Sequence, residues 1–176
     1  MRFAYADPPY IGWARAHYGP DAKEVNHRLL IAHLEEFDGW ALSLSSPSLR
    51  TILPMCPEDV RVGAWVKPFA IFKPNVNPGY CWEPVIFKPL RKLGRDRGTV
   101  RDYVSARVTF GKGTVGAKPE EFCRWLFDLV GAEPADDFTD LFPGSGAVGM
   151  AWESWRAQSQ MPLPDHSTQI AMEATA

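Results

Sequence analysis

A glycine-rich turn near the C-terminal end is the feature that most restricts the fold of this 176-residue chain. The segment DLFPGSGAVGMAW spaces Gly144, Gly146 and Gly149 as GxGxxG between an expected strand, Phe138–Phe142, and an expected helix, Val148–Trp155. Glycines in such a turn let the backbone approach a ligand, and the helix N-terminus offers free N–H groups. The pattern favours an α/β fold with a nucleotide-type ligand. A tight turn that only packs a helix on a strand has the same signature.

The rest of the chain alternates expected strands and helices, which is typical of an open, mostly parallel α/β sheet. We predict a minimal sheet of about five strands with helices on both faces. The expected strands are Arg2–Ala6, Trp40–Leu44, Val60–Val66, Val85–Phe87 and Phe138–Phe142; the longer expected helices are Ala22–Phe37 and Lys118–Val130, and Pro68–Gly79 is an expected loop.

Length and composition indicate one domain over residues 1–156, followed by a polar tail over residues 157–176. No apolar run approaches the roughly 20 residues of a membrane helix, and the N-terminal sequence lacks the apolar stretch of a signal peptide. The three cysteines are widely spaced and include no CxxC pair, so we expect neither a disulfide framework nor a zinc site. A reducing cytoplasm is the expected location.

A dinucleotide-binding domain is excluded by the residues on the C-terminal side of the glycine turn. That fold needs an acidic residue about 20 residues further on, at the end of a second strand. Here the chain offers only Asp165, within the proline-containing stretch MPLPDHSTQ, which has no strand pattern.

The tetrapeptide Asp7-Pro8-Pro9-Tyr10 directly follows the first expected strand. Each proline fixes its own φ and lacks an N–H group, and Pro9 pushes Pro8 toward an extended conformation. A backbone carbonyl and a carboxylate then face outward together, followed by an aromatic ring. A strand that simply ends at two prolines beside a surface aspartate is the plain alternative.

Two fixed acceptors followed by a ring suit one substrate group well. The exocyclic amine of a nucleobase has two N–H donors and a lone pair that is delocalised into the ring. Acceptors that hold both hydrogens free this lone pair for attack, and an aromatic side chain stacks on the base. Such a site works by positioning and electrostatics rather than by strong base catalysis.

Four ordered motifs, spread over about residues 1–155, resemble those of the S-adenosylmethionine-dependent DNA N6-adenine methyltransferases of the permuted β class, whose motif order the eukaryotic RNA adenine methyltransferases share. DPPY resembles the catalytic motif, and DLFPGSGAVG resembles the cofactor motif. Between them, the stretch GAWVKP…YCWEPVIF resembles two later strands of the catalytic half, and KPEE at Lys118–Glu121 resembles the segment that precedes the cofactor motif.

The resemblance implies a circularly permuted, Rossmann-like class I methyltransferase fold with S-adenosylmethionine as cofactor. It places Asp7, Pro8, Pro9 and Tyr10 in catalysis and brings Asp7 beside the glycine turn. For the cofactor it implies Asp7, Lys118, Pro119, Asp140, Phe142, Pro143, Gly144, Ser145 and Gly146. The family continues into a strand whose acid binds the ribose, and since that strand is not recognisable here, Glu153 and Asp165 are the nearest acids.

A basic segment over residues 88–116 suggests how a nucleic acid would be held. It contains eight Lys and Arg residues against two Asp, in a chain of net charge −2. Phosphate contact is favoured over a merely solvated loop. The expected substrate contacts are Tyr10, Trp13, Glu83, Arg91, Arg95 and Arg97. For Glu83, the alternative is a surface carboxylate at the end of a strand.

We predict methyl transfer to the exocyclic amine of adenine in DNA, with loose specificity or a partner subunit, which includes a homodimer. RNA adenine and the N4 amine of DNA cytosine are the closest alternative substrates. A non-catalytic nucleic-acid-binding module on a methyltransferase scaffold is the alternative from another class of protein.

Overall fold

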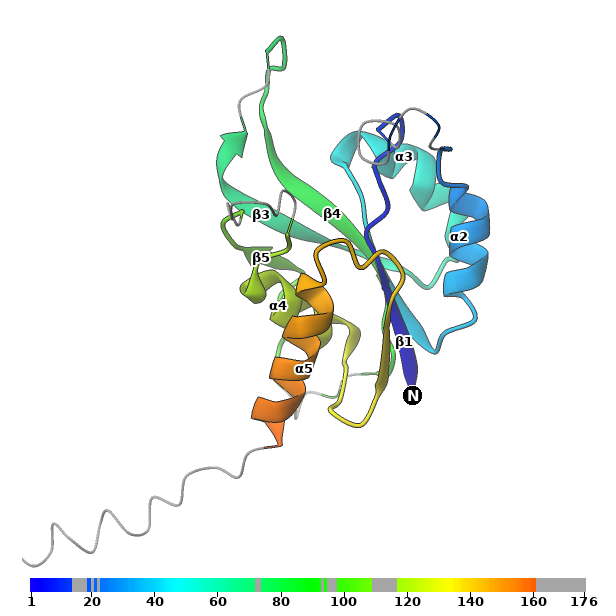
Figure 1. Ribbon diagram of the computed structural model, residues 1–176, viewed down its shortest axis with the longest axis vertical. Helices are drawn as coiled ribbons and strands as arrows, with labels where there is room; N and C mark the ends of the chain where they lie inside the picture. Colours follow the sequence, from blue (N-terminus) through cyan, green and yellow to red (C-terminus); the bar gives the residue numbers. More distant parts are fainter. Residues whose placement is uncertain are drawn as a thin grey trace, which may run out of the picture.

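A computed structural model describes residues 1–13, 19, 21, 23–71, 74–92, 94, 98–108 and 117–160. Within them one sheet has the strand order β5-β3-β4-β2-β1-β6 (Figure 1). The strands are β1 (Arg2–Ala6), β2 (Gly39–Ser43), β3 (Arg61–Ile71), β4 (Tyr80–Lys88), β5 (Tyr103–Ser105) and β6 (Asp137–Asp140).

The sheet is mostly parallel, as predicted. β1 runs parallel to both β2 and β6, and β3 runs parallel to β5. Only β4 is antiparallel to its neighbours, β2 and β3. The predicted count of about five strands missed β5, because its three residues lie in a stretch without any hydrophobic period.

Helices cover both faces of the sheet. Helices α2 (His27–Leu34) and α3 (Leu49–Ile52), with the 3₁₀ turns η1 (Ser46–Ser48) and η2 (Leu53–Met55), pack on one face. Helices α4 (Glu120–Val130) and α5 (Ala147–Ser159) pack on the other. The expected helix over residues 22–37 is shorter in the structure, since the Asn26 side chain caps the first turn by accepting from the N–H groups of Arg28 and Leu29.

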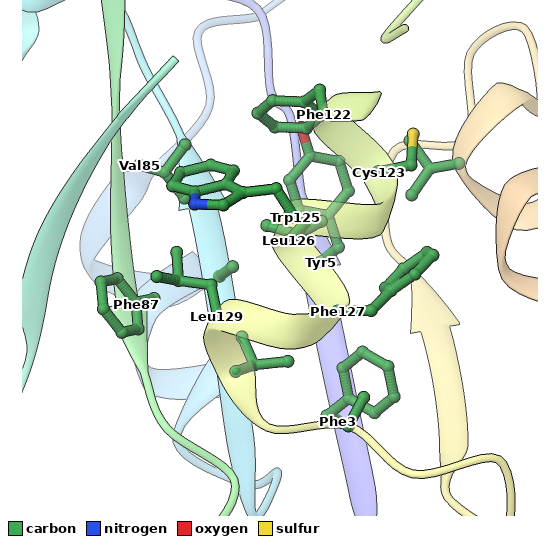
Figure 2. Packing of buried hydrophobic residues seen from close by; sticks show 14 of the residues in the cluster. Phe3, Tyr5, Val85, Phe87, Phe122, Cys123, Trp125, Leu126, Phe127 and Leu129 are labelled. Atoms are coloured by element: carbon green, nitrogen blue, oxygen red, sulfur yellow. The ribbon is translucent and has the colours of Figure 1, made fainter. Parts of the chain in front are cut away.

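The face under α4 holds an aromatic core. Figure 2 shows Phe3 and Tyr5 of β1 packed beneath Phe122 and Phe127 of α4. Alternation along β1 sends these two side chains to α4, whereas Ala4 and Ala6 face α2 and α3. By the same alternation, the residue that follows Ala6 points to the α4 side.

Strands β3 and β4 form a two-stranded ribbon that extends beyond the sheet (Figure 1). β4 pairs with β2 only over residues 85–88, so its first residues project past the carboxyl end of β2. The first four residues of the expected loop Pro68–Gly79 therefore belong to this ribbon, because β3 continues to Ile71, whereas residues 74–79 are outside any strand, as expected.

The C-terminal helix also differs from its prediction. Helix α5 continues to Ser159, so the boundary expected at residue 156 falls inside it. Most of the expected tail, residues 161–176, lies outside the described residues. Among the residues that the structure describes, no helix is long and apolar enough to cross a membrane.

Candidate functional site

The two motifs of the sequence meet at the carboxyl edge of the sheet. β1 leads into Asp7 and β6 leads into the glycine turn, and these two strands pair in parallel with Tyr5 opposite Asp140. The Leu141 N–H donates to the Tyr5 carbonyl at 2.9 Å, which continues the pairing to the first residue of the turn. The predicted neighbourhood of the tetrapeptide and the glycine turn is confirmed.

Lys118 contacts Asp7 directly. Its Nζ lies 3.0 Å from Asp7 Oδ2, and only 6% of the Lys118 side chain is exposed. Burial lowers the pKa of Lys118, but the carboxylates of Asp7 and Glu83 outweigh burial and bring it above its usual value. Lys118 is therefore a buried cation whose charge is held by two acids.

Glu83 is the second of these acids. Its Oε2 lies 3.6 Å from Lys118 Nζ, while its Oε1 accepts a hydrogen bond from Lys67 Nζ. Oε2 is buried and has no hydrogen-bond partner among the described residues. Burial raises the pKa of Glu83, yet Lys118 and Lys67 bring it below its usual value.

Tyr10 completes this cluster. Burial raises the pKa of its phenol far above the usual value, and the negative charges of Glu83 and Asp7 add to the effect. Tyr10 is half-buried, whereas Pro8 and Pro9 beside it are buried. A neutral phenol ring thus lies at the rim of a charged cluster.

The ring of Trp65 contacts both lysines of this cluster, Lys67 and Lys118. Lys67 Nζ lies 4.8 Å from the centre of the Trp65 ring, and Lys118 Nζ lies 5.2 Å from the same ring. Sequence reasoning missed Lys67. The available signal was alternation along β3, because Gly63, Trp65 and Lys67 occupy successive buried positions and a lysine on that face needs a charged partner.

The glycine turn presents open backbone. Gly144 and Gly146 have φ angles of 47° and 75°, which favour glycine. A Cβ added at Gly146 would meet no heavy atom of the described residues within 4 Å. The Asp140 side chain holds the start of the turn by accepting from the Phe142 N–H at 3.1 Å. Burial, together with the nearby charge of Asp7, raises the pKa of Asp140.

A cavity of about 390 Å³ adjoins the turn between β6 and α5. Asp140, Gly149 and Glu153 are among its lining residues, so Glu153 faces the same space as the end of β6. A second cavity, of about 720 Å³, lies between α4 and residues 98–103, and none of the predicted site residues lines it.

The remaining predicted cofactor residues lie around the same edge. Pro119 is buried at the N-cap of α4, next to Lys118. Phe142 is half-buried, and Pro143, Gly144 and Ser145 are exposed. Of the predicted substrate residues, Glu83 lies in the charged cluster. Trp13, 52% exposed, follows Tyr10 in a turn closed by its N–H on the Tyr10 carbonyl at 2.8 Å.

Arg91 is placed at the opposite edge of the sheet. Its guanidinium contacts both carboxylate oxygens of Asp136 at 2.7 and 2.8 Å, just before β6 begins, and it also donates to the Gly131 carbonyl. The α-amino group of Met1 binds the same Asp136 at 3.0 Å. The expected substrate contact by Arg91 therefore does not belong to the cluster around Asp7. Arg95 and Arg97 lie outside the described residues.

Comparison with known proteins gives similarity to solved structures only. No protein-family model matches the chain, and no curated protein matches it. The crystal structure of the M1.HpyAVI–SAM complex is similar with a TM-score of 0.60 and 16% identity, over 89% of this chain and 78% of that one. The crystal structure of M1.HpyAVI is similar with a TM-score of 0.52 and 15% identity, over 89% and 76%. At these identities the likeness shows that this chain has the fold of M1.HpyAVI.

Proposed function

We propose that this protein transfers a methyl group from S-adenosylmethionine to the exocyclic N6 amine of adenine in DNA. The observation that carries the proposal is the position of Asp7 beside the glycine turn, through the pairing of β1 with β6. The fold shared with the M1.HpyAVI–SAM complex supports S-adenosylmethionine as the ligand of that turn. The adenine target and the permuted motif order rest on the sequence resemblance.

The residues around the turn fit this donor. Open space at Gly146 lets the donor approach the backbone, and the N-terminus of α5 suits its carboxylate. Asp140 and Asp7 supply negative charge for its cationic end. The rest of the proposed donor-binding surface consists of Phe142, Pro143, Gly144 and Ser145. Lys118 and Pro119 lie beside this surface. When bound, the donor would supply an electrophilic methyl group, and its sulfur would keep the electron pair of the broken S–CH3 bond as a neutral thioether.

The chain's own groups act on the target amine. One oxygen of Asp7 and the Pro8 carbonyl accept the two N–H bonds, while Pro9 keeps this segment rigid. The nitrogen lone pair is then directed at the methyl group, so positioning and electrostatics lower the barrier. Tyr10 stacks on the base, and the surplus proton of the methylated amine passes to water.

One observation favours a second candidate function. Within the described residues, β6 is the last strand on its side of the sheet, so no further strand there supplies a ribose-binding acid. A nucleic-acid-binding module that transfers no methyl group would tolerate this. Titration calorimetry with S-adenosylmethionine separates the two, since the enzyme binds the donor and such a module does not.

The direct test of the proposal is mass spectrometry of nucleosides from cells that express the protein. We expect N6-methyl-2′-deoxyadenosine from DNA with the wild-type chain and its absence with Asp7→Ala. Methylation found only in RNA, or only on cytosine, would replace adenine in DNA by one of the alternative substrates. No modified nucleoside, together with no donor binding, would contradict the proposed function.

A further inference from the structure

Four charges of alternating sign form a chain that leads from β3 to the tetrapeptide. Lys67 pairs with Glu83, Glu83 lies near Lys118, and Lys118 pairs with Asp7. The side chains of both lysines are more than nine-tenths buried, and that of Glu83 is 15% exposed. At this depth charge–charge interactions are weakly screened, so each pair affects the next.

Lys118 has two competing partners. Its Nζ is 3.0 Å from Asp7 Oδ2 but 3.6 Å from Glu83 Oε2, so the ion pair with Asp7 is the closer of the two. Glu83 Oε2 has no hydrogen bond within the described part of the chain, so it can accept one from either donor that faces Glu83, which are Lys118 and the Tyr10 phenol. The other oxygen of Glu83, Oε1, accepts a hydrogen bond from Lys67 Nζ, so a second cation lies against the same carboxylate.

We propose that Lys67 is a positioning residue for the methyl transfer: by neutralising Glu83, it keeps Lys118 on Asp7 Oδ2. This inference rests on the proposed function. With Lys118 on one oxygen, Asp7 is held in a fixed orientation and its other oxygen faces the target amine. Without Lys67, the unneutralised Glu83 draws Lys118 away and Asp7 loses that orientation.

A double-mutant cycle tests this role against simple packing of Lys67 on Trp65. Lys67→Met keeps the aliphatic stem and removes the charge, and the same change is made in the Glu83→Gln background. If Lys67 acts through the charge of Glu83, Lys67→Met lowers kcat about tenfold when Glu83 is present and by less than about twofold in the Glu83→Gln background. A packing role lowers kcat equally in both.

The matched control is Arg61→Met. Arg61 lies on the same strand as Lys67, at its other end, and its guanidinium also lies over an aromatic ring, that of Phe87 at 5.5 Å. We expect its kcat to equal that of the wild type. Lys67→Arg, which keeps the charge, should recover most of the activity, and KM for the DNA should change little in either Lys67 variant.

A crystal structure of Lys67→Met gives a readout that does not depend on activity. We expect Lys118 Nζ within hydrogen-bonding distance of Glu83 Oε2 and no longer on Asp7. Equal losses in the two backgrounds, no loss in either, or Lys118 still on Asp7 would each overturn the proposal. If Lys67→Met folds poorly, Lys67→Gln carries the same cycle. The outcomes that would overturn the role of Lys67 leave the proposed function intact. Only a wild-type protein without methyl transfer would contradict that function.

Discussion

Lys118 Nζ lies 3.0 Å from Asp7 Oδ2, so a buried lysine just before α4 holds the carboxylate that follows β1. The contact joins two of the four sequence motifs, although nothing in either motif alone indicates it. It also ties Asp7 to the charge of Glu83, which lies on a third element, because Lys118 is near both carboxylates. Three elements distant in sequence therefore share one charged cluster at the carboxyl edge of the sheet.

Removal of the Asp7 carboxylate should nearly abolish methyl transfer but weaken donor binding only slightly, because Asp140 still supplies negative charge beside the turn. Asp7→Ala takes away one of the two acceptors of the target amine, and we expect kcat to fall by at least about 100-fold, as for other preorganised polar groups at reacting centres. The protein should still fold, because Lys118 keeps Glu83 as a partner. Single-turnover methylation assays and calorimetry with S-adenosylmethionine measure the two effects separately.

The control for Asp7→Ala is Asp21→Ala, which removes an exposed aspartate from the same N-terminal region. It should leave both methyl transfer and donor binding at wild-type values. Near-wild-type turnover by Asp7→Ala would show that the assigned mechanism is wrong.

Donor binding should depend on the absence of a side chain at Gly146. Gly146→Ala places a Cβ in the open space above the turn, and we expect the Kd for S-adenosylmethionine to rise about tenfold or more. Gly98→Ala is a matched control, because Gly98 has the same φ of 75° and no described heavy atom within 4 Å of an added Cβ. Both variants carry similar backbone strain, so equal Kd values in calorimetry would place the donor elsewhere.

Local sequence patterns predicted most of the fold. The hydrophobic spacing of residues 120–130 and Gly131 gave helix α4 and its end, and the tetrapeptide after β1 gave one half of the site. The residues at which helices and strands end were harder to predict from the sequence. β3 continues to Ile71 through a proline, and the cross-strand pairing with β4 that supports this extension is not visible in sequence alone.

The electrostatics of the site lay beyond sequence reasoning. Lys67, Glu83 and Lys118 come from three elements, and the contacts among them depend on how β3, β4 and the start of α4 pack together. The charge of Arg91 was read as part of a basic surface. Its real partner, Asp136, is distant in sequence and buried, so composition could not separate a structural arginine from a phosphate-binding one.

The ion pair of Arg91 and Asp136 should contribute to stability rather than to substrate binding. Burial raises the pKa of Asp136, but Arg91 and the Met1 amino group more than offset burial and bring it to about 2. A lowered carboxyl pKa stabilises the fold above the ordinary value near 4 and loses this contribution as pH falls through about 2. At neutral pH the contribution is on the order of 2 kcal/mol.

Arg91→Gln tests this role. We expect Tm at pH 7 to fall by about 5 °C, because Asp136 is left with the Met1 amino group alone as a charged partner among the contacts described. The difference from the wild type should shrink below about pH 4 as the carboxyl becomes protonated. A Tm difference that is the same at pH 7 and pH 3, measured by differential scanning calorimetry, would contradict this assignment.

Nucleic-acid affinity should come from the basic segment, residues 88–116, without Arg91. Arg95→Gln combined with Arg97→Gln removes two cations, and we expect weaker binding to all sequences alike. Each lost phosphate contact reduces the slope of log affinity against log salt by roughly 0.9 on duplex DNA, so the slope of the double variant should be smaller by about two units.

Arg91→Gln is the internal control. The Arg91 guanidinium is already paired with Asp136, so the slope of this variant should match that of the wild type. Filter binding over a salt series measures all three proteins. An unchanged slope in the double variant would mean that the substrate docks elsewhere, and a flatter slope in Arg91→Gln would mean that this arginine leaves Asp136 for phosphate.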